Sequence, residues 1–387
     1  MSANHMNTKH PSSETALANR VLVVTPVGLE GRGGIDRLNR YMVNYLRGSE
    51  DGKRLDFVAS RGEARDPFWA FHFAGALARF AAKAATGRYG LAHIHVSTNG
   101  SSYRKCAFGW IARRFGIPYV VHYHGDFHHV MVAKLPLWAR ALSNLARGAE
   151  TAVVLGQPFV EPFVKVLGVD PARVKIVHNG IPDIGMEAVV PRPARDTAHI
   201  VFSGEVGLRK GVDILVEGLA VIGPDAPAWR CTIAGNGDLD VWKTRVAEAG
   251  LQDKVTFTGW VAIETVHDLM RDADIVVLPS RAEALPLSLI EGTSAGAALV
   301  ACDTGAVREV VIDGLNGMIV PRDGKALAQT LRTLLDDPVM RARMQSASRS
   351  LFLQEFHMQR FVAGMLAVYE NARCRRGAVV ELHAPAE

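Results

Sequence analysis

The sequence is poor in the features that mark secreted, membrane-spanning and metal-bound proteins. It has four cysteines in 387 residues, and their wide separation argues against a disulfide framework or a cysteine-based metal site. No stretch approaches the roughly 18 consecutive apolar residues of a transmembrane helix. Residues 1–19 are polar and lack the apolar core of a secretory signal, so we expect a mobile tail there. These absences predict a cytoplasmic protein.

Net charge is small, but it is unevenly divided along the chain. There are 44 Lys and Arg against 39 Asp and Glu. Residues 1–185 hold 23 of the basic residues and 13 of the acidic ones, so the first half is basic and the second is acidic. A basic domain can meet nucleic acid, an anionic membrane or a phosphorylated substrate, or its charges can simply be solvated.

Short runs rich in Val and Ile alternate with segments long enough to form helices. This alternation is typical of buried parallel strands in βαβ units. The runs are 21–26, 55–60, 91–97, 119–125, 151–156 and 175–179, then 199–204, 229–235, 255–260, 274–280, 298–303 and 317–322. The sequence therefore predicts an α/β protein of two doubly wound, Rossmann-like domains that face each other across a cleft.

Composition along the chain suggests where these domains begin and end. Two prolines and mixed charges mark a linker, and an apolar stripe near the C-terminus predicts a helix that packs back toward the first domain. The predicted parts are a tail (1–19), a first domain (20–184), a linker (185–198), a second domain (199–355), a C-terminal helix (356–372) and a poorly ordered polar tail (373–387).

Two glutamates, Glu283 and Glu291, follow the run at 274–280 and are separated by seven residues. Pro286 suits the first turn of a helix, so Glu283 is predicted in a loop at the rim of the cleft and Glu291 about one turn into the helix. The N-terminus of a helix offers free N–H groups and a positive dipole end, which favour a phosphate. We expect the two carboxylates to approach one ligand from two directions.

Two other segments carry candidate ligands for an anion. Arg209 and Lys210 lie at the first strand-to-helix turn of the second domain, where adjacent cations suit a diphosphate, although a solvated pair is the alternative. Gly33 and Gly34 follow the first strand and let the backbone approach a ligand closely. This loop is not a dinucleotide fingerprint, because Asp36 occupies the place of the third glycine in G-x-G-x-x-G.

Together these segments resemble the retaining GT-B glycosyltransferases, in particular glycosyltransferase family 4 (glycosyl transferases group 1). The glutamate spacing, the Gly33-Gly34 pair and the Lys210-Gly211 pair all match that family. The resemblance covers most of residues 20–371 and is densest over 199–338. Further matches are His124-Gly125, Asn179-Gly180-Ile181, Gly235-Asn236-Gly237, Phe257 with Gly259, and Gly314 with Gly317.

The resemblance implies that the second domain binds a UDP- or GDP-linked sugar as co-substrate, with no other cofactor. Glu291 is expected to accept hydrogen bonds from the ribose hydroxyls. Glu283 is expected to hold hydroxyls of the donor sugar, assisted by backbone N–H groups near Leu285 and Leu287. Lys210 is expected to neutralise the diphosphate.

Other implied contacts flank the nucleotide or come from the first domain. Trp260 and Val261 are expected beside the base, and Gly33 and Gly34 near the diphosphate and sugar. His124 is expected to face the reacting sugar. On the residues alone, His124 and Trp260 could instead be ordinary core residues.

The sequence departs from the family at two positions. Glu205 stands where many members have an arginine that binds phosphate, and Arg209 is the predicted substitute. Pro286 replaces a frequent glycine and removes one N–H donor. The predicted catalytic residues are thus Glu283, Lys210, Arg209 and His124. The resemblance implies transfer of a sugar to a hydroxyl with retention of configuration. No paired-aspartate metal motif is evident and the Arg209-Lys210 pair can meet the diphosphate, so we expect the reaction to be metal-independent.

The acceptor is expected at the first domain and, by the resemblance, to be a lipid-linked or polysaccharide intermediate of cell-surface glycan synthesis. Segment 66–90 combines aromatic with basic residues, which suits either an anionic membrane surface or a helix that faces the core. The residues are Phe68, Trp69, Phe71, Phe73 and Phe80 with Arg79, Lys83 and Arg88. The membrane alternative would make the protein peripheral on the inner face of the membrane. Nucleic acid is not an expected partner. Remaining alternatives are a nucleotide-sugar epimerase, a glycan phosphorylase or a non-catalytic nucleic-acid-binding protein.

Overall fold

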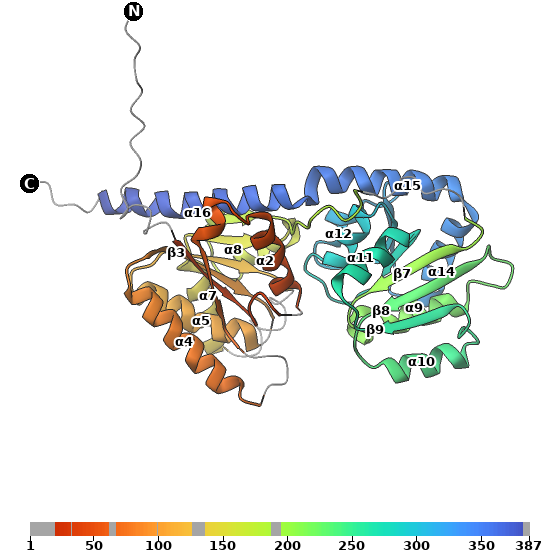
Figure 1. Ribbon diagram of the computed structural model, residues 1–387, viewed down its shortest axis with the longest axis horizontal. Helices are drawn as coiled ribbons and strands as arrows, with labels where there is room; N and C mark the ends of the chain where they lie inside the picture. The colour runs from red at the N-terminus through yellow and green to blue at the C-terminus, as the bar shows by residue number, and fades with distance from the viewer. Residues whose placement is uncertain are drawn as a thin grey trace, which may run out of the picture.

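The computed structural model describes residues 20–31, 33–61, 67–98, 100–125, 136–186 and 195–381. It contains two six-stranded sheets, one in each half of the chain, and every strand pairing is parallel (Figure 1). The α/β class with two doubly wound domains is therefore confirmed. The predicted tail 1–19 lies outside the described residues, as do 187–194 of the linker.

The first sheet has the strand order β2-β1-β3-β4-β5-β6. Its four central strands are almost wholly buried, which is why they appear in the sequence as continuous apolar runs, whereas the two edge strands are partly exposed. The strands are β1 (Arg20–Thr25), β2 (Leu55–Ala59), β3 (Tyr89–Val96), β4 (Tyr119–Tyr123), β5 (Thr151–Val154) and β6 (Val174–Ile176). The helices are α2 (Gly34–Tyr45), α3 (Glu50–Arg54), α4 (Trp69–Ala85), α5 (Gly100–Arg114), α7 (Pro136–Arg147) and α8 (Val160–Lys165), with short 3-10 turns at Gln157–Phe159 and Pro171–Arg173.

The second sheet has the order β12-β11-β10-β7-β8-β9, so β7 lies at its centre between β8 and β10. The strands are β7 (Ala198–Ser203), β8 (Trp229–Ala234), β9 (Val255–Gly259), β10 (Ile275–Leu278), β11 (Ala298–Cys302) and β12 (Gly317–Val320). The helices are α9 (Val212–Ala220), α10 (Leu239–Glu248), α11 (Ile263–Asp272), α12 (Leu287–Ser294), α13 (Val307–Val310), α14 (Gly324–Asp336) and α15 (Pro338–Leu351), with a 3-10 turn at Leu208–Lys210 and a π-helical turn at Phe352–Phe356.

The chain crosses between the domains twice at one place. The Ile181 N–H donates to the Phe356 carbonyl at 3.0 Å, and the Met358 N–H donates to the Ile181 carbonyl at 2.9 Å. The second crossing leads into α16 (Met358–Glu381), which lies along the first domain (Figure 1). Its predicted end at residue 372 is wrong, because the helix continues to Glu381 through much of the segment that was expected to be a tail.

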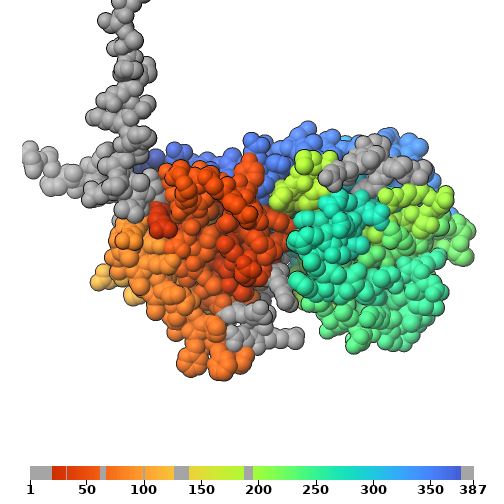
Figure 2. Space-filling view, in the orientation of Figure 1, coloured from red at the N-terminus to blue at the C-terminus, as the bar shows by residue number. Residues whose placement is uncertain are grey.

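The two domains touch each other on the α2 side of the first and the α11–α12 side of the second (Figure 2). The Tyr41 hydroxyl of α2 lies 3.1 Å from Nε2 of His267 in α11. In the described part of the chain, no helix is both long and apolar enough to cross a bilayer.

Candidate active site

The site lies at the carboxyl ends of β7 and β10, the neighbouring strands at which the second sheet reverses its order. Open α/β sheets bind ligands at such a switch point, because loops from adjacent strands diverge there and leave a crevice. The loop after β7 contains Lys210 and the loop after β10 contains Glu283. The two residues are thereby brought together from positions far apart in the sequence.

Lys210 and Glu283 form an ion pair inside this crevice. The Lys210 Nζ donates to Glu283 Oε1 at 2.5 Å, and the two side chains are 14% and 8% exposed. Gly211 makes the close approach of the two loops feasible: its φ is +73°, and a Cβ there would lie 1.9 Å from the Pro279 carbonyl oxygen. Lys210 and Glu283, both predicted to be catalytic, thus lie in contact and largely shielded from solvent.

Glu291 lies on α12 and faces the first domain instead. Its side chain is 0% exposed, and the Arg37 Nη2 of α2 approaches its Oε1 at 3.1 Å. Among the described residues neither carboxylate oxygen has a hydrogen-bond partner of good geometry. Burial raises the pKa of Glu291, and the nearby Arg37 charge opposes that rise. Sequence reasoning found Glu291 and missed Arg37.

The N-terminal ends of α2 and α12 meet across the cleft. A Cβ at Gly34 would lie 3.7 Å from Leu287 Cδ1, so the first turns of the two helices lie close together. Leu287 and Glu291 are four residues apart and share one face of α12, which places Glu291 one turn further along. Gly33 and Pro286, the residues before these helices, have no side chain that could cap the free N–H groups. The junction is thus electropositive and suited to an anion.

Arg209, the predicted substitute for a missing phosphate ligand, does not join the Lys210–Glu283 pair. Its Nη2 pairs with Glu205 Oε2 at 2.5 Å, and both side chains are more than half exposed. Glu205 is therefore the ion-pair partner of Arg209, whose Nη1 also lies 3.5 Å from the Ala282 carbonyl, next to Glu283. A role for Arg209 on the diphosphate remains a prediction.

The residues expected around the donor sugar and base differ in burial. Leu285 and Leu287 are buried, and the Asn179 Nδ2 donates to the Leu285 carbonyl at 3.0 Å. The Asn179-Gly180 turn thereby positions the loop that carries Glu283. Trp260 is 52% exposed just past β9, and Val261 packs partly against the core. The exposed face of Trp260 disfavours its alternative role as a core residue.

His124 ends a chain of side chains that begins on α2. The Asn39 Nδ2 donates to the Ile35 carbonyl, so the Asn39 Oδ1 is left to accept from His95 Nε2 at 3.1 Å. His95 Nδ1 then accepts from His124 Nε2–H at 2.8 Å. Burial lowers the pKa of His124 to about 3, so this imidazole is neutral at physiological pH.

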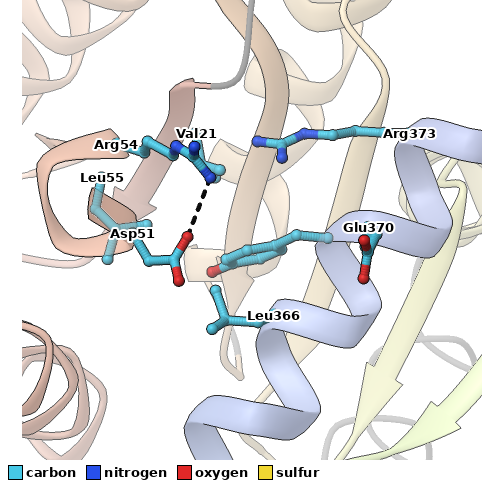
Figure 3. A pocket seen from close by; sticks show the side chains of 8 residues that line it. Val21, Asp51, Arg54, Leu55, Leu366, Glu370 and Arg373 are labelled. Atoms are coloured by element: carbon cyan, nitrogen blue, oxygen red, sulfur yellow. Dashed lines mark hydrogen bonds and ion pairs between the residues drawn. The ribbon is translucent and has the colours of Figure 1, made fainter. Parts of the chain in front are cut away.

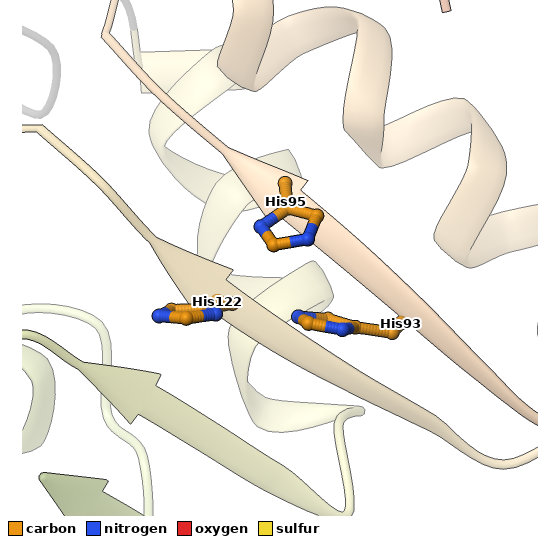
Figure 4. Close-up of side chains that lie close together, drawn as sticks. All are labelled: His93, His95 and His122. Carbon is orange, nitrogen blue, oxygen red and sulfur yellow. The ribbon is translucent and has the colours of Figure 1, made fainter. Parts of the chain in front are cut away.

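Three histidines beneath the cleft are close enough to be considered as metal ligands (Figure 4). One ring nitrogen from each of His93, His95 and His122 lies within 4.8 Å of the others, and all three are buried on β3 and β4. Both nitrogens of His95 are engaged as described above, and His93 Nδ1 lies 2.7 Å from the Tyr369 hydroxyl of α16. His122 alone keeps both nitrogens without a hydrogen-bond partner among the described residues. The cluster fits a packed polar layer better than a metal centre.

A cavity of about 280 Å³ lies at the opposite edge of the first sheet (Figure 3). It lies between α16 and the beginnings of β1 and β2, where Val21 and Leu55 line it. Charged groups from α3 and α16 surround it, including Arg54, Glu370 and Arg373. Ligands of doubly wound sheets bind at the carboxyl ends of strands, so we do not assign the substrate to this cavity.

Comparison with protein families matches both halves of the chain. Residues 16–180 match the glycosyl transferase 4-like domain, and residues 189–351 match the glycosyl transferases group 1. A D-inositol 3-phosphate glycosyltransferase of Xylanimonas cellulosilytica is 28% identical over 333 residues, which are 79% of this chain and 78% of the relative. A glycogen synthase of Mycobacterium tuberculosis is 28% identical over 60% of this chain and 56% of its own length.

Solved structures share the architecture at lower identity. HepE of Anabaena, in complex with UDP, aligns with a TM-score of 0.74 and 18% identity, covering 91% of this chain and 99% of its own. Sucrose-phosphate synthase of Thermosynechococcus elongatus aligns with a TM-score of 0.71 and 19% identity, covering 91% and 98%. Both carry the same pair of domains.

Proposed function

The chain belongs to the family 4 type of GT-B glycosyltransferases, and on that basis we propose that it moves a sugar from a nucleotide diphosphate to a hydroxyl acceptor with retention of configuration. The observation that carries the proposal is the pair of buried carboxylates, Glu283 and Glu291, each facing one cation at the joint of two helix N-termini. Carboxylates suit sugar and ribose hydroxyls, while cations and helix ends suit the diphosphate between them.

In the proposed reaction the bond from the sugar C1 to the diphosphate oxygen breaks as a bond from C1 to the acceptor oxygen forms on the same face. The acceptor proton passes to an oxygen of the departing phosphate. Negative charge grows on that phosphate as it leaves, and Lys210 with the first turns of α2 and α12 would stabilise it. Because these fixed positive groups meet the charge, we propose that the reaction needs no divalent metal ion.

His124 is proposed to face the reacting sugar as a neutral group. Its Nε2–H is committed to His95, so the Nδ1 lone pair is the group that can accept a hydrogen bond from a hydroxyl. A neutral imidazole adds no repulsion toward an oxocarbenium-like centre, so the low pKa suits this place.

The donor can be identified by thermal shift with a series of UDP- and GDP-sugars. A ligand present at 100 times its Kd raises the free energy of unfolding by about 2.7 kcal/mol. Incubation of the stabilising sugar with simple acceptors, followed by NMR of the product anomer, then tests retention. Conversion of the donor sugar without acceptor would indicate an epimerase, and stabilisation by nucleic acid but by no nucleotide would indicate the binding protein.

We propose further that the acceptor is lipid-linked and that the amino-terminal end of α4 meets the membrane. Phe68, Trp69 and Phe71 are 61%, 51% and 78% exposed there. The rest of the helix behaves as a core helix, since Phe80 is fully buried and packs edge-on against Phe108 of α5. Segment 66–90 thus has an exposed aromatic end that could meet a membrane and a remainder that packs into the core.

The helix α5, which packs alongside α4 and runs in the same direction, has a second group of exposed basic and aromatic side chains near its carboxyl-terminal end. Trp110 and Phe115 are exposed, as are Arg113 and Arg114. A surface of this kind suits anionic headgroups with aromatic rings at the interface. The double variant F68S/F71S is expected to lose flotation with phosphatidylglycerol vesicles at low salt. V339S, which changes an exposed apolar residue of the second domain, is the control. Equal flotation of both variants would contradict the membrane proposal.

A further inference from the structure

The cations in the predicted motifs do not suffice to neutralise the diphosphate of a donor bound in the cleft. A nucleotide diphosphate brings at least two negative charges. Of the cations predicted to meet it, Lys210 is already paired with Glu283, and Arg209 is already paired with Glu205. Another cation would have to compensate, and the described part of the cleft contains one that no motif identified.

That cation is Arg37, in the first turn of α2. It lies three residues after Gly34, whose backbone lies close to Leu287 of α12, and its side chain reaches across to Glu291. The Arg37 side chain is 21% exposed, so it is neither sealed into the core nor free in solvent. It comes from the domain opposite Lys210, and the two cations therefore approach the junction from its two sides.

The contact between Arg37 and Glu291 has hydrogen-bonding capacity to spare. Only Nη2 of the guanidinium approaches the carboxylate, at 3.1 Å, instead of the two-pronged arrangement that arginine favours. The buried Nε of Arg37 and both carboxylate oxygens have no hydrogen-bond partner of good geometry among the described residues. A buried ion pair stabilises a protein only when its remaining donors and acceptors are satisfied. A ligand with both hydroxyls and anionic oxygens would satisfy these groups: its hydroxyls could donate to Glu291 and its anionic oxygens could accept from Arg37.

We propose that Arg37 binds the diphosphate of the donor and supplies the cation that the second domain lacks. The inference rests on the proposed function and deepens it. The ribose hydroxyls donate to the Glu291 oxygens, and the unused guanidinium N–H groups of Arg37 donate to the phosphate oxygens. Donor binding then joins the two domains through a charged ligand from each, Arg37 and Lys210.

The test compares the nucleoside monophosphate with the diphosphate, so that the contribution of the second phosphate is isolated. Kd values for UMP, UDP, GMP and GDP are measured by calorimetry at fixed salt for the wild type, R37Q, R37K and R47Q. Arg47 is an exposed arginine near the end of the same helix and serves as the matched control. A charge-assisted hydrogen bond corresponds to about a 10- to 100-fold change in affinity.

R37Q is expected to reduce the gain in affinity from mono- to diphosphate by at least about 10-fold, with R37K intermediate and R47Q unchanged. An equal loss for mono- and diphosphate in R37Q would overturn the inference and reduce Arg37 to a support for Glu291. An unchanged diphosphate affinity in R37Q would overturn it as well. If the wild type binds none of the four nucleotides, the proposed function itself fails. That result differs from one in which the wild type binds them and R37Q binds them with the same affinity.

Discussion

Glu291→Gln should stabilise the ligand-free protein while it weakens donor binding. In the wild type, Glu291 is fully buried, and its pKa is raised because the cost of burying its charge exceeds the help from Arg37. The amide has nearly the same shape and carries no charge. Arg37 loses its partner in this variant, but its side chain is 21% exposed and can be hydrated where it lies. The reverse variant, Arg37→Gln, leaves the charge on the side chain that water cannot reach.

The two variants are therefore expected to have opposite signs. Replacing a buried charge whose pairing is poor contributes about 1 kcal/mol to the free energy of unfolding, or about 2–4 °C in Tm. Removing Arg37, the cation that faces this buried carboxylate, costs about 1–3 kcal/mol. The difference between the variants is thus larger than either shift alone, and it should be measured in the same experiment.

The effect of Glu291→Gln should also depend on pH. The pKa of Glu291 is raised in the folded state, so the folded protein holds this proton more tightly than the unfolded chain. The stability of the wild type falls as pH rises from the unfolded pKa, about 4.3, through the raised folded pKa. Glutamine does not titrate, so the advantage of the variant should be present at pH 7.5 and absent near pH 4.

Urea unfolding without nucleotide, at pH 7.5 and pH 4.5, measures these differences. Glu248→Gln, which changes an exposed carboxylate at the end of α10, is the control and should be neutral. A thermal-shift series with the donor on the same samples should show a reduced shift for Glu291→Gln. Should this variant be less stable than the wild type at pH 7.5, the pairing with Arg37 outweighs burial and the reasoning is refuted.

Three further predictions concern the same site. Lys210→Met should lower kcat by about 100-fold or more, because it removes a fixed charge at the departing phosphate; near-normal steady-state turnover would contradict that role. Gly211→Ala should cost more than about 2 kcal/mol in urea unfolding, because its Cβ would lie 1.9 Å from the Pro279 carbonyl oxygen. Gly250→Ala, with φ +69° and open space around it, should cost only about 1 kcal/mol, so equal losses would argue against the steric reason. EDTA should leave initial rates unchanged, whereas loss of activity that Mg²⁺ restores would exclude the metal-free mechanism.

The strands were predictable because the central ones are buried on both faces and so form continuous apolar runs. Glu283 and Lys210 were predictable because both follow central strands and so lie at one edge of the sheet. The end of α16 was not predictable from its apolar stripe, because the stripe stops near Ala372 while the backbone continues as helix to Glu381. Residues 373–381 include three arginines, whose helix propensity is good, and they extend the anchored helix although they also include Gly377.

Arg37 could not be identified from local pattern, because its partner lies in the other domain. In sequence it is an ordinary charged residue of an amphipathic helix, and only its place just after Gly33-Gly34 hinted at the cleft. The histidine layer carried a clearer signal that was missed. His93 and His95 alternate along one strand, as His122 and His124 do along the next, so all four lie on one face of the sheet.

The return of α16 to the first domain affects how the protein is made. Tyr369 packs fully buried against His93 of β3, so the core of the first domain is completed by residues at the far end of the chain. At about 5–20 residues per second, synthesis takes about 10–40 s to proceed from the end of that domain to α16. During this interval the nascent first domain exposes the groove that α16 later fills. Chaperone protection and translation speed over the second half of the message should therefore govern the yield of folded protein.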